Sequence, residues 1–168
     1  PIISGVAHDN TESLATVRRV PNEPGMAAKV FTLLAEAGVN VDMIVQASAS
    51  TGTADISFTV PGSAAAKVRD VLQEKQDELG YQSFDIDANV GKVAVVGVGM
   101  KTHSGLAAKF FNALSDEGVN VLMISTSEIR IAALVPLEQL QDAVRALHTA
   151  YGLDAEQVEA VVYGGTGR

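Results

Sequence analysis

The sequence contains neither cysteine nor tryptophan among its 168 residues. Without cysteine, disulfide bonds and thiolate chemistry are excluded, and a reducing cytoplasm is the compartment that this composition favours. No stretch approaches the roughly 18 consecutive apolar residues that a membrane-spanning helix needs. The opening PIISGVAHDN lacks the basic region and the long apolar stretch of a secretory signal. We therefore expect a cytoplasmic protein.

Positive charge is also scarce. Lysine and arginine number 12 against 20 acidic residues, which gives a net charge of −8 with no basic cluster. Nucleic-acid phosphates require a basic face, so nucleic-acid binding is excluded. The histidines His8, His103 and His148 lie in unrelated segments without metal-ligand spacing, so we expect no metal and assign them surface or capping roles. Hydrophobic residues make up 47% of the chain, which is enough to form a core.

The sequence repeats itself after eighty positions. GMAAKVFTLLAEAGVNVDMI (25–44) and GLAAKFFNALSDEGVNVLMI (105–124) are identical at 12 of 20 positions, including GVNV. A repeat of this length in a chain of this size indicates two small domains of the same fold.

The pattern of the first copy alternates between strand and helix. Residues 13–20 alternate apolar and polar side chains, which predicts a strand. Asn22 is a candidate N-cap for a helix over 26–37, which Gly38 ends. Further strands are predicted over 39–48, 54–60 and 81–90, with a helix over 63–80 that starts at a Ser63 cap and ends at Gly80.

The second copy has the same order. A strand over 91–99 precedes a helix over 104–117, strands near 119–126 and 128–135, a helix near 137–149 and a strand over 158–163. Each β-α-β-β-α-β unit predicts a ferredoxin-like, α+β fold, with a four-stranded antiparallel sheet and two helices on one face. We expect domains at 13–88 and 91–163.

The sequence predicts one strand more than two four-stranded units require. Residues 2–7 (IISGVA) also have a strand pattern. The N-terminal segment 1–12 is therefore expected to complete the second sheet, and VEAVVY (158–163) the first, by exchange of edge strands. The chain ends in YGGTGR (163–168), and its last residues, 164–168, are expected to form a flexible tail or to contact a partner.

The repeated segment has features of a ligand site. A helix N-terminus exposes unpaired N–H groups and a partial positive charge, so it can hold a carboxylate. Gly25 and Gly105 would let a ligand approach the backbone, and the asparagine of GVNV can both donate and accept. An amino-acid zwitterion would fit such a site, although the same residues also serve as ordinary helix caps. No catalytic constellation and no cofactor motif stand out.

Several motifs resemble a known family. ISTSEIRI (124–131), preceded by GVNV and GVGMKTHSG (97–105) and followed by the tail AVVYGGTGR, resembles the C-terminal regulatory region of aspartokinases. The likeness runs from GVAHD (5–9) to Arg168 and is nearest to the separate regulatory (β) subunit of the actinobacterial α2β2 type. The proline-glycine-helix-GVN element is shared by ACT domains generally.

This resemblance implies a fold, partners and a function. It implies two tandem ACT domains, whose sheets join side by side in a homodimer. It also implies threonine, or lysine with threonine, bound at the interfaces to inhibit a catalytic (α) subunit that phosphorylates aspartate with ATP. The glycine-rich lysine motif of the kinase is absent, so this chain alone is expected to be no enzyme.

The resemblance also implies two effector pockets. The first would use Asn22, Pro24, Gly25, Met26, Ala27 and Gln46, faced by the partner's Asn120, Val121 and Ile124. The second, pseudo-equivalent pocket would use Thr102, Ser104, Gly105, Leu106, Ala107 and Thr126, faced by Asn40, Val41 and Ile44.

The sequence departs from the family pattern at Asn22 (usually aspartate), Ala47 (usually asparagine), Ala54 (usually threonine), Ser104 (usually proline) and Leu122 (usually an acid). The aspartate pairs with the ammonium group of the effector. Loss of such a charge-assisted bond costs about 1.5–3 kcal/mol, or roughly ten- to hundredfold in affinity. We therefore expect weakened or altered feedback, unless Glu23 replaces the missing acid.

Two alternatives remain open from the sequence. One is a subunit that keeps the assembly but has lost effector control. The other is a small ferredoxin-like enzyme of the acylphosphatase kind, for which Arg18 and Arg19 are the faint candidates.

Overall fold

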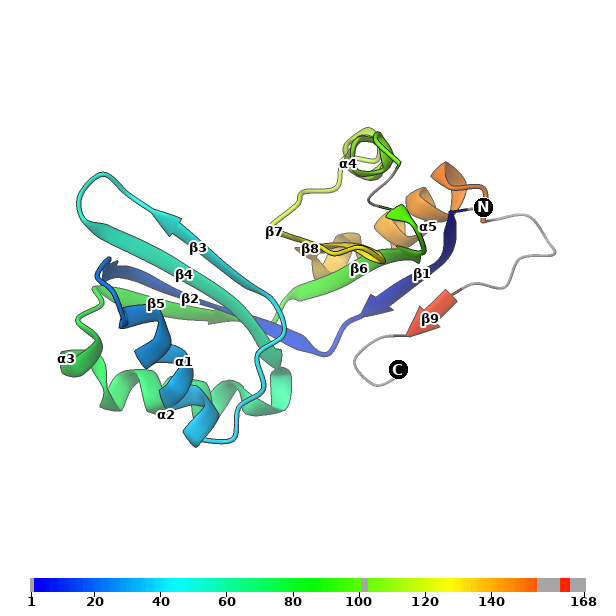
Figure 1. The fold of residues 1–168 in the computed structure, drawn as a ribbon. Helices are drawn as coiled ribbons and strands as arrows, with labels where there is room; N and C mark the ends of the chain where they lie inside the picture. The colour runs from blue at the N-terminus through cyan, green and yellow to red at the C-terminus, as the bar shows by residue number, and fades with distance from the viewer. Residues whose placement is uncertain (1, 101–102, 154–160, 164–168) are drawn as a thin grey trace. The chain divides into compact units, whose positions relative to one another are not determined.

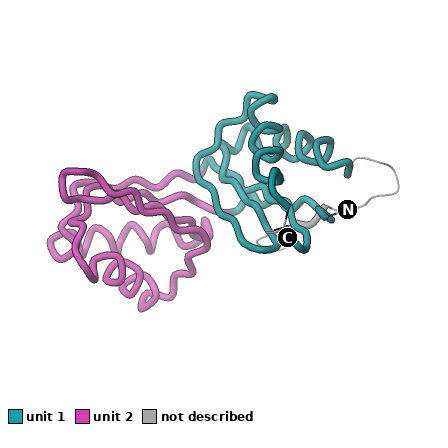
Figure 2. The backbone as a smooth tube through the Cα atoms, turned by 45° about the horizontal axis from the view of Figure 1, so that its top comes forward, with its two compact units in different colours: residues 1–11, 89–168 teal, residues 12–88 magenta. Residues whose placement is uncertain are grey.

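The computed structural model describes residues 2–100, 103–153 and 161–163, the last three by their backbone alone. The chain divides into two compact units (Figure 2). Unit 2 is the continuous segment Glu12–Ala88, and unit 1 combines Pro1–Thr11 with Asn89–Arg168. Thr102 and the tail 164–168, both named above, lie outside the described residues.

Unit 2 is a four-stranded antiparallel sheet with its helices on one face (Figure 1). The sheet order is β3-β4-β2-β5, as the β-α-β-β-α-β pattern requires. Its elements are β2 (Glu12–Pro21), α1 (Met26–Glu36), β3 (Ile44–Ser48), β4 (Thr53–Pro61), α2 (Ala65–Glu74), α3 (Gln76–Leu79) and β5 (Ser83–Asp87).

Unit 1 repeats this arrangement with one strand more, in the order β7-β8-β6-β1-β9 (Figure 1). Its elements are β1 (Ile3–Asp9), β6 (Val90–Gly97), α4 (Leu106–Asp116), β7 (Met123–Thr126), β8 (Arg130–Pro136), α5 (Leu140–Ala150) and β9 (Val161–Tyr163). The two ferredoxin-like units predicted from the repeat are therefore confirmed.

The expected placement of the last strand in the first sheet is wrong. β9 pairs in parallel with β1, with Val6 opposite Val161, so it belongs to unit 1. The physical reason is that no edge is open for it beside β2, because β5 already pairs there with Leu14 opposite Asp87. The N-terminal strand β1 pairs antiparallel with β6, from Ile3 opposite Gly97 to Asp9 opposite Lys92.

The GVNV repeat has a structural role at the end of each first helix. In unit 2 the amide of Gly38 donates to Ala35 O at 2.9 Å, and that of Val39 donates to Leu34 O at 2.9 Å. Gly38 has φ +78, and Val39 is 6% exposed. This is a Schellman motif, which satisfies the last helical carbonyls and buries the residue after the glycine. Gly118 and Val119 form the same bonds, to Ser115 O at 2.9 Å and Leu114 O at 3.0 Å.

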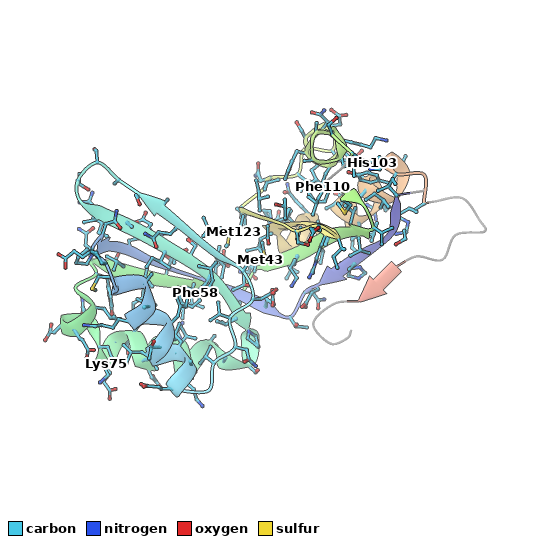
Figure 3. All side chains as sticks on the ribbon, in the orientation of Figure 1. Met43, Phe58, Lys75, His103, Phe110 and Met123 are labelled. Carbon is cyan, nitrogen blue, oxygen red and sulfur yellow. The ribbon has the colours of Figure 1, made fainter. Side chains whose placement is uncertain are left out.

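Each unit has its own hydrophobic core between sheet and helices. In unit 2 the ring of Phe58 is fully buried and meets Phe31 of α1 edge to face, with centroids 5.4 Å apart (Figure 3). In unit 1 the fully buried Phe110 of α4 meets Phe111 at 4.9 Å. Truncating a buried aromatic of this kind costs about 3–5 kcal/mol.

Two expected helix caps are wrong. The N-cap of α1 is Gly25 without any side-chain cap, because Asn22 lies three residues earlier and bonds to strand β3 instead. Ser63 lies in the 3₁₀ turn Gly62–Ala64, so it does not cap α2. The helix expected over 63–80 is also broken at Lys75, and Gly80 ends its second part in a left-handed conformation.

Candidate functional site

Unit 2 contains a pocket where the end of β2 meets the start of α1. Its volume is about 90 Å³. Its lining combines the end of β2, the turn before α1, the first turn of α1, and residues of β3 and β4. The pocket is lined by Val20, Pro21, Asn22, Glu23, Gly25, Met26, Ala27, Ala28, Gln46, Ala54 and Ile56.

The start of α1 supplies backbone donors to this pocket. Gly25 adopts φ 92 and ψ −11, a left-handed conformation that favours glycine. An added Cβ would meet no heavy atom within 4 Å, so the backbone angle, not space, requires the glycine. The first N–H groups of a helix have no intrahelical partner, and Ala27 and Ala28 of this first turn line the pocket. The site can therefore accept an anionic group.

Two polar lining residues, Asn22 and Gln46, belong to a short hydrogen-bonded chain of side chains that continues to Ser48, outside the lining. The carboxamide nitrogen of Asn22 donates to Ser48 Oγ at 3.2 Å. The carboxamide oxygen of Asn22 accepts from Gln46 Nε2 at 3.4 Å. Glu23 is the one ionisable side chain among the lining residues that the structure describes here. The polar part of the lining is therefore built mainly from neutral amides.

A β-bulge shapes the approach of β2 to the pocket. The register between β2 and β4 shifts between Val17 and Val20, and Arg19 has a left-handed φ of 58. Its amide donates to Asp55 Oδ1 at 2.9 Å, which holds the bulge in place. Arg18 forms an ion pair with Asp85 on β5. Neither arginine lines the pocket, so the phosphate-loop geometry of the acylphosphatase alternative has no support.

Unit 1 contains a second pocket at the corresponding place. Gly105 starts α4 with φ 92 and ψ −12, within a degree of Gly25. The pocket volume is about 260 Å³, and its lining comprises Met100, His103, Ser104, Gly105, Leu106, Ala107, Thr126, Ser127 and Ile131. His103 Nδ1 lies 2.9 Å from Gly99 O. His103 is thus an exposed residue that contacts a backbone carbonyl, as expected, and it also lines the pocket.

The structure brings most of the predicted pocket residues together within each unit. Asn22, Gly25, Met26, Ala27 and Gln46 line the unit 2 pocket, whereas Pro24 does not. Ser104, Gly105, Leu106, Ala107 and Thr126 line the unit 1 pocket, and Thr102 lies outside the described residues.

The residues predicted to face these pockets do not line the pocket of their own unit. Asn40 and Val41 follow α1, and Ile44 opens the edge strand β3 with 54% of its surface exposed. Asn120 and Val121 follow α4 in the same way, and Ile124 on the edge strand β7 is 48% exposed. Ile44 and Ile124 thus lie on exposed edge strands, and the other four residues lie in the loops that precede these strands.

Known proteins match this chain along its whole length. A model of the ACT domain matches residues 18–76 and 93–151. Aspartokinase from Corynebacterium glutamicum is 46% identical over 169 residues, which cover 99% of this chain and 40% of that protein. A crystal structure of aspartokinase alpha and beta subunits superposes with a TM-score of 0.85 and 42% identity, covering 90% of this chain and 99% of that chain.

The chain belongs to the ACT-domain family, as a regulatory part of aspartokinase. The regulatory subunit of aspartate kinase from Thermus thermophilus also matches, with a TM-score of 0.85, 36% identity and 99% of that chain covered. The chain spans about 40% of the length of the curated aspartokinases it matches. It corresponds to the regulatory ACT-domain part of those proteins.

Several lining residues of the ACT pockets were not predicted as such. Ile56 and Ala54 reach the first pocket because they alternate toward the helix face of β4. Ile131 does the same for β8 in the second pocket. Period-2 alternation marks these residues as inward-facing, but only the strand register shows that they lie beside a helix start.

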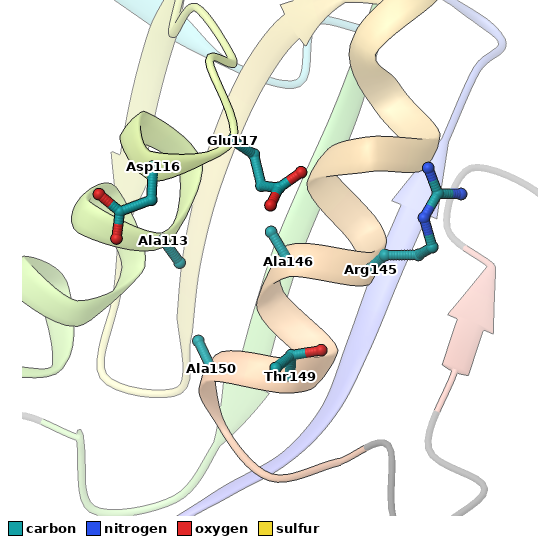
Figure 4. A pocket seen from close by; sticks show the side chains of 7 residues that line it. All are labelled: Ala113, Asp116, Glu117, Arg145, Ala146, Thr149 and Ala150. Carbon is teal, nitrogen blue, oxygen red and sulfur yellow. The ribbon is translucent and has the colours of Figure 1, made fainter.

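A third hollow of about 350 Å³ lies between helices α4 and α5 of unit 1 (Figure 4). Its floor is formed by the small side chains of Ala113, Ala146 and Ala150. Asp116 ends α4 and Glu117 follows it, while Arg145 of α5 points away from both (Figure 4) and pairs with Asp142. The hollow contains no predicted site residue.

Within residues 2–100 and 103–153, no helix is long and apolar enough to span a membrane. The same residues contain no group of three or more histidine or carboxylate side chains that could hold a metal ion.

Proposed function

We propose that this chain is the allosteric sensor of an aspartokinase, and that it binds threonine, or lysine together with threonine, for feedback control of the catalytic subunit. The observation that carries the proposal is the duplicated pocket. Each ACT unit places a left-handed glycine, an open helix start and polar strand side chains around one small cavity.

The unit 2 pocket has the parts that an amino-acid zwitterion requires. The α-carboxylate would accept from the first-turn amides of α1, near Ala27 and Ala28. The ammonium group would donate to the carboxamide oxygens of Asn22 or Gln46. The apolar floor at Ile56 would contact a short side chain.

Dimer formation would complete each pocket. β3 and β7 are edge strands, and their exposed apolar side chains include Ile44 and Ile124. Exposed edge strands offer unpaired backbone groups for pairing with another chain. We propose that two copies join their ACT sheets there, so that Asn120, Val121 and Ile124 of one copy face the unit 2 pocket of the other.

The unit 2 pocket also supports weakened feedback. With Asn22 in place of an acid, the effector ammonium would meet neutral oxygens, and charge-assisted bonds are roughly twice as strong as neutral ones. Glu23 lines the same pocket and offers a carboxylate that compensates in part.

The test is the inhibition of an aspartokinase that carries the kinase region together with this chain. We expect threonine, or lysine with threonine, to inhibit it. Asn22→Asp should lower the half-inhibiting concentration about ten- to hundredfold. Ser50→Ala, in the exposed turn after β3, is the matched control and should change nothing. Activity that ignores both amino acids in the native and the Asn22→Asp enzymes would favour the alternative, an assembly subunit without effector control.

A further inference from the structure

We infer that Ser48 is a positioning residue for the unit 2 pocket: it orients the Asn22 carboxamide so that the oxygen is presented to a cationic group of the ligand. The inference rests on the proposed function, since the ligand is an amino acid. Ser48 does not itself line the pocket. It would act through Asn22, whose carboxamide nitrogen donates to Ser48 Oγ at 3.2 Å.

Strand register places Ser48 where it can do this. Ser48 pairs with Ala54 and Gln46 pairs with Ile56, and both partners line the pocket. Side chains alternate between the two faces of a strand, so Gln46 and Ser48 share the pocket face while Ala47 points to the other. Asn22 meets both residues of β3 from the side of the helix start.

The backbone of Asn22 is held in place by a hydrogen bond, so that only the orientation of its side chain remains to be determined. The amide of Asn22 donates to Gly52 O at 2.9 Å, in the turn between β3 and β4. The carboxamide has an accepting oxygen and a donating NH₂ group. To bind a cation, it must be oriented with the oxygen, and not the NH₂ group, toward the ligand. Ser48 and Gln46 together orient it in this way, because Ser48 takes the nitrogen end and Gln46 Nε2 occupies one lone pair of the oxygen. The second lone pair of that oxygen is available to a ligand.

A carboxylate at the same position would not need this help. Its two oxygens are equivalent acceptors, so either can meet an ammonium group without being oriented. The role of Ser48 is therefore specific to an asparagine at position 22. This dependence separates a positioning role from a merely structural one, since loss of strand structure would affect both residues alike.

The experiment is a double-mutant cycle on the full chain, with the dissociation constant of threonine measured by calorimetry. With Asn22 present, Ser48→Ala should weaken binding about two- to tenfold, the effect of one neutral hydrogen bond. Ser48→Thr retains a hydroxyl and should stay within about twofold of the native chain. In the Asn22→Asp background, Ser48→Ala should change affinity by less than about twofold. Ser50→Ala is the control in both backgrounds.

An unchanged affinity in Ser48→Ala, or an equal loss in both backgrounds, would overturn the inference while leaving the proposed function intact. A native chain that binds neither threonine nor lysine would overturn the proposed function. A measurement without ligand tests the role of Ser48 independently of the proposed function. The side-chain amide protons of Asn22, followed by NMR, should exchange with water faster in Ser48→Ala than in the native chain, and equal rates would refute the orientation itself.

Discussion

Gly38 and Gly118 offer a direct test of why GVNV occurs twice. Both glycines end a helix in the left-handed region, with φ +78 and +73, and a Cβ added to either would meet no heavy atom within 4 Å. A residue with a Cβ costs about 1–2 kcal/mol in this conformation. Because no steric clash adds to this cost, we expect Gly38→Ala to destabilise unit 2, and Gly118→Ala unit 1, by about 1–2 kcal/mol each.

The assay is thermal unfolding combined with amide hydrogen exchange. For a domain of this size, 1 kcal/mol corresponds to a shift in Tm of roughly 4–8 °C. Exchange should quicken at Gly38 and Val39, whose amides close the helix end, while the other unit keeps its protection. Gly38→Asn should cost less, because asparagine tolerates the left-handed region better than alanine. Asn40→Ala is the exposed control and should be nearly neutral.

A small effect would refute this reasoning. If Gly38→Ala changed stability by less than about 0.3 kcal/mol, the Schellman geometry would not be what the glycine provides. An equal cost for Gly38→Asn and Gly38→Ala would likewise exclude backbone conformation as the cause.

Three further predictions concern other parts of the two units. Burial raises the pKa of Tyr151 to about 12, and its hydroxyl donates to Leu106 O at 2.7 Å. Since Tyr151 ionises first in the unfolded chain, at about 10, denaturation curves should show its full contribution to stability below that pH and the loss of this contribution as pH rises toward 12. Tyr151→Phe should abolish this part of the pH dependence. Arg19→Gly should raise the free energy of unfolding by up to about 1 kcal/mol, because glycine relieves the left-handed strain at a smaller entropic cost. The urea midpoint should rise accordingly, and a fall would contradict this. Gly97→Ala would bring a Cβ onto the backbone oxygen of Ile2, so the start of β1 must move. We expect a loss of about 1–3 kcal/mol and faster exchange at Val98, whose amide donates to Ile2 O at 3.3 Å, and an unchanged exchange rate would contradict the packing.

The elements with a strong local period could be predicted from the sequence. The helix-period spacing of Val30 and Leu34 and the alternation along β4 each determine which face is buried, and both residues are fully buried. Gly38 and Gly80 could be predicted as helix ends because a left-handed residue without a Cβ is a local requirement.

What the sequence could not predict depends on contacts between distant segments. β9 pairs with β1 in parallel, across most of the chain, and no local pattern specifies that partner. Asn22 is a residue type that often caps helices, but its side chain forms hydrogen bonds with Ser48 and Gln46 of β3 instead. The repeated helix start in the sequence predicted the location of both pockets. Ile56 and Ile131 also line them, but this follows from the strand register, which the sequence does not specify.

The most direct test of the central claim is calorimetry of the purified chain with threonine and with lysine, separately and together, alongside its mass by light scattering. The proposal predicts a dimer that binds threonine, with affinity raised by Asn22→Asp. A dimer that binds neither amino acid, with Asn22 or with aspartate in its place, would contradict the sensor and leave an assembly subunit.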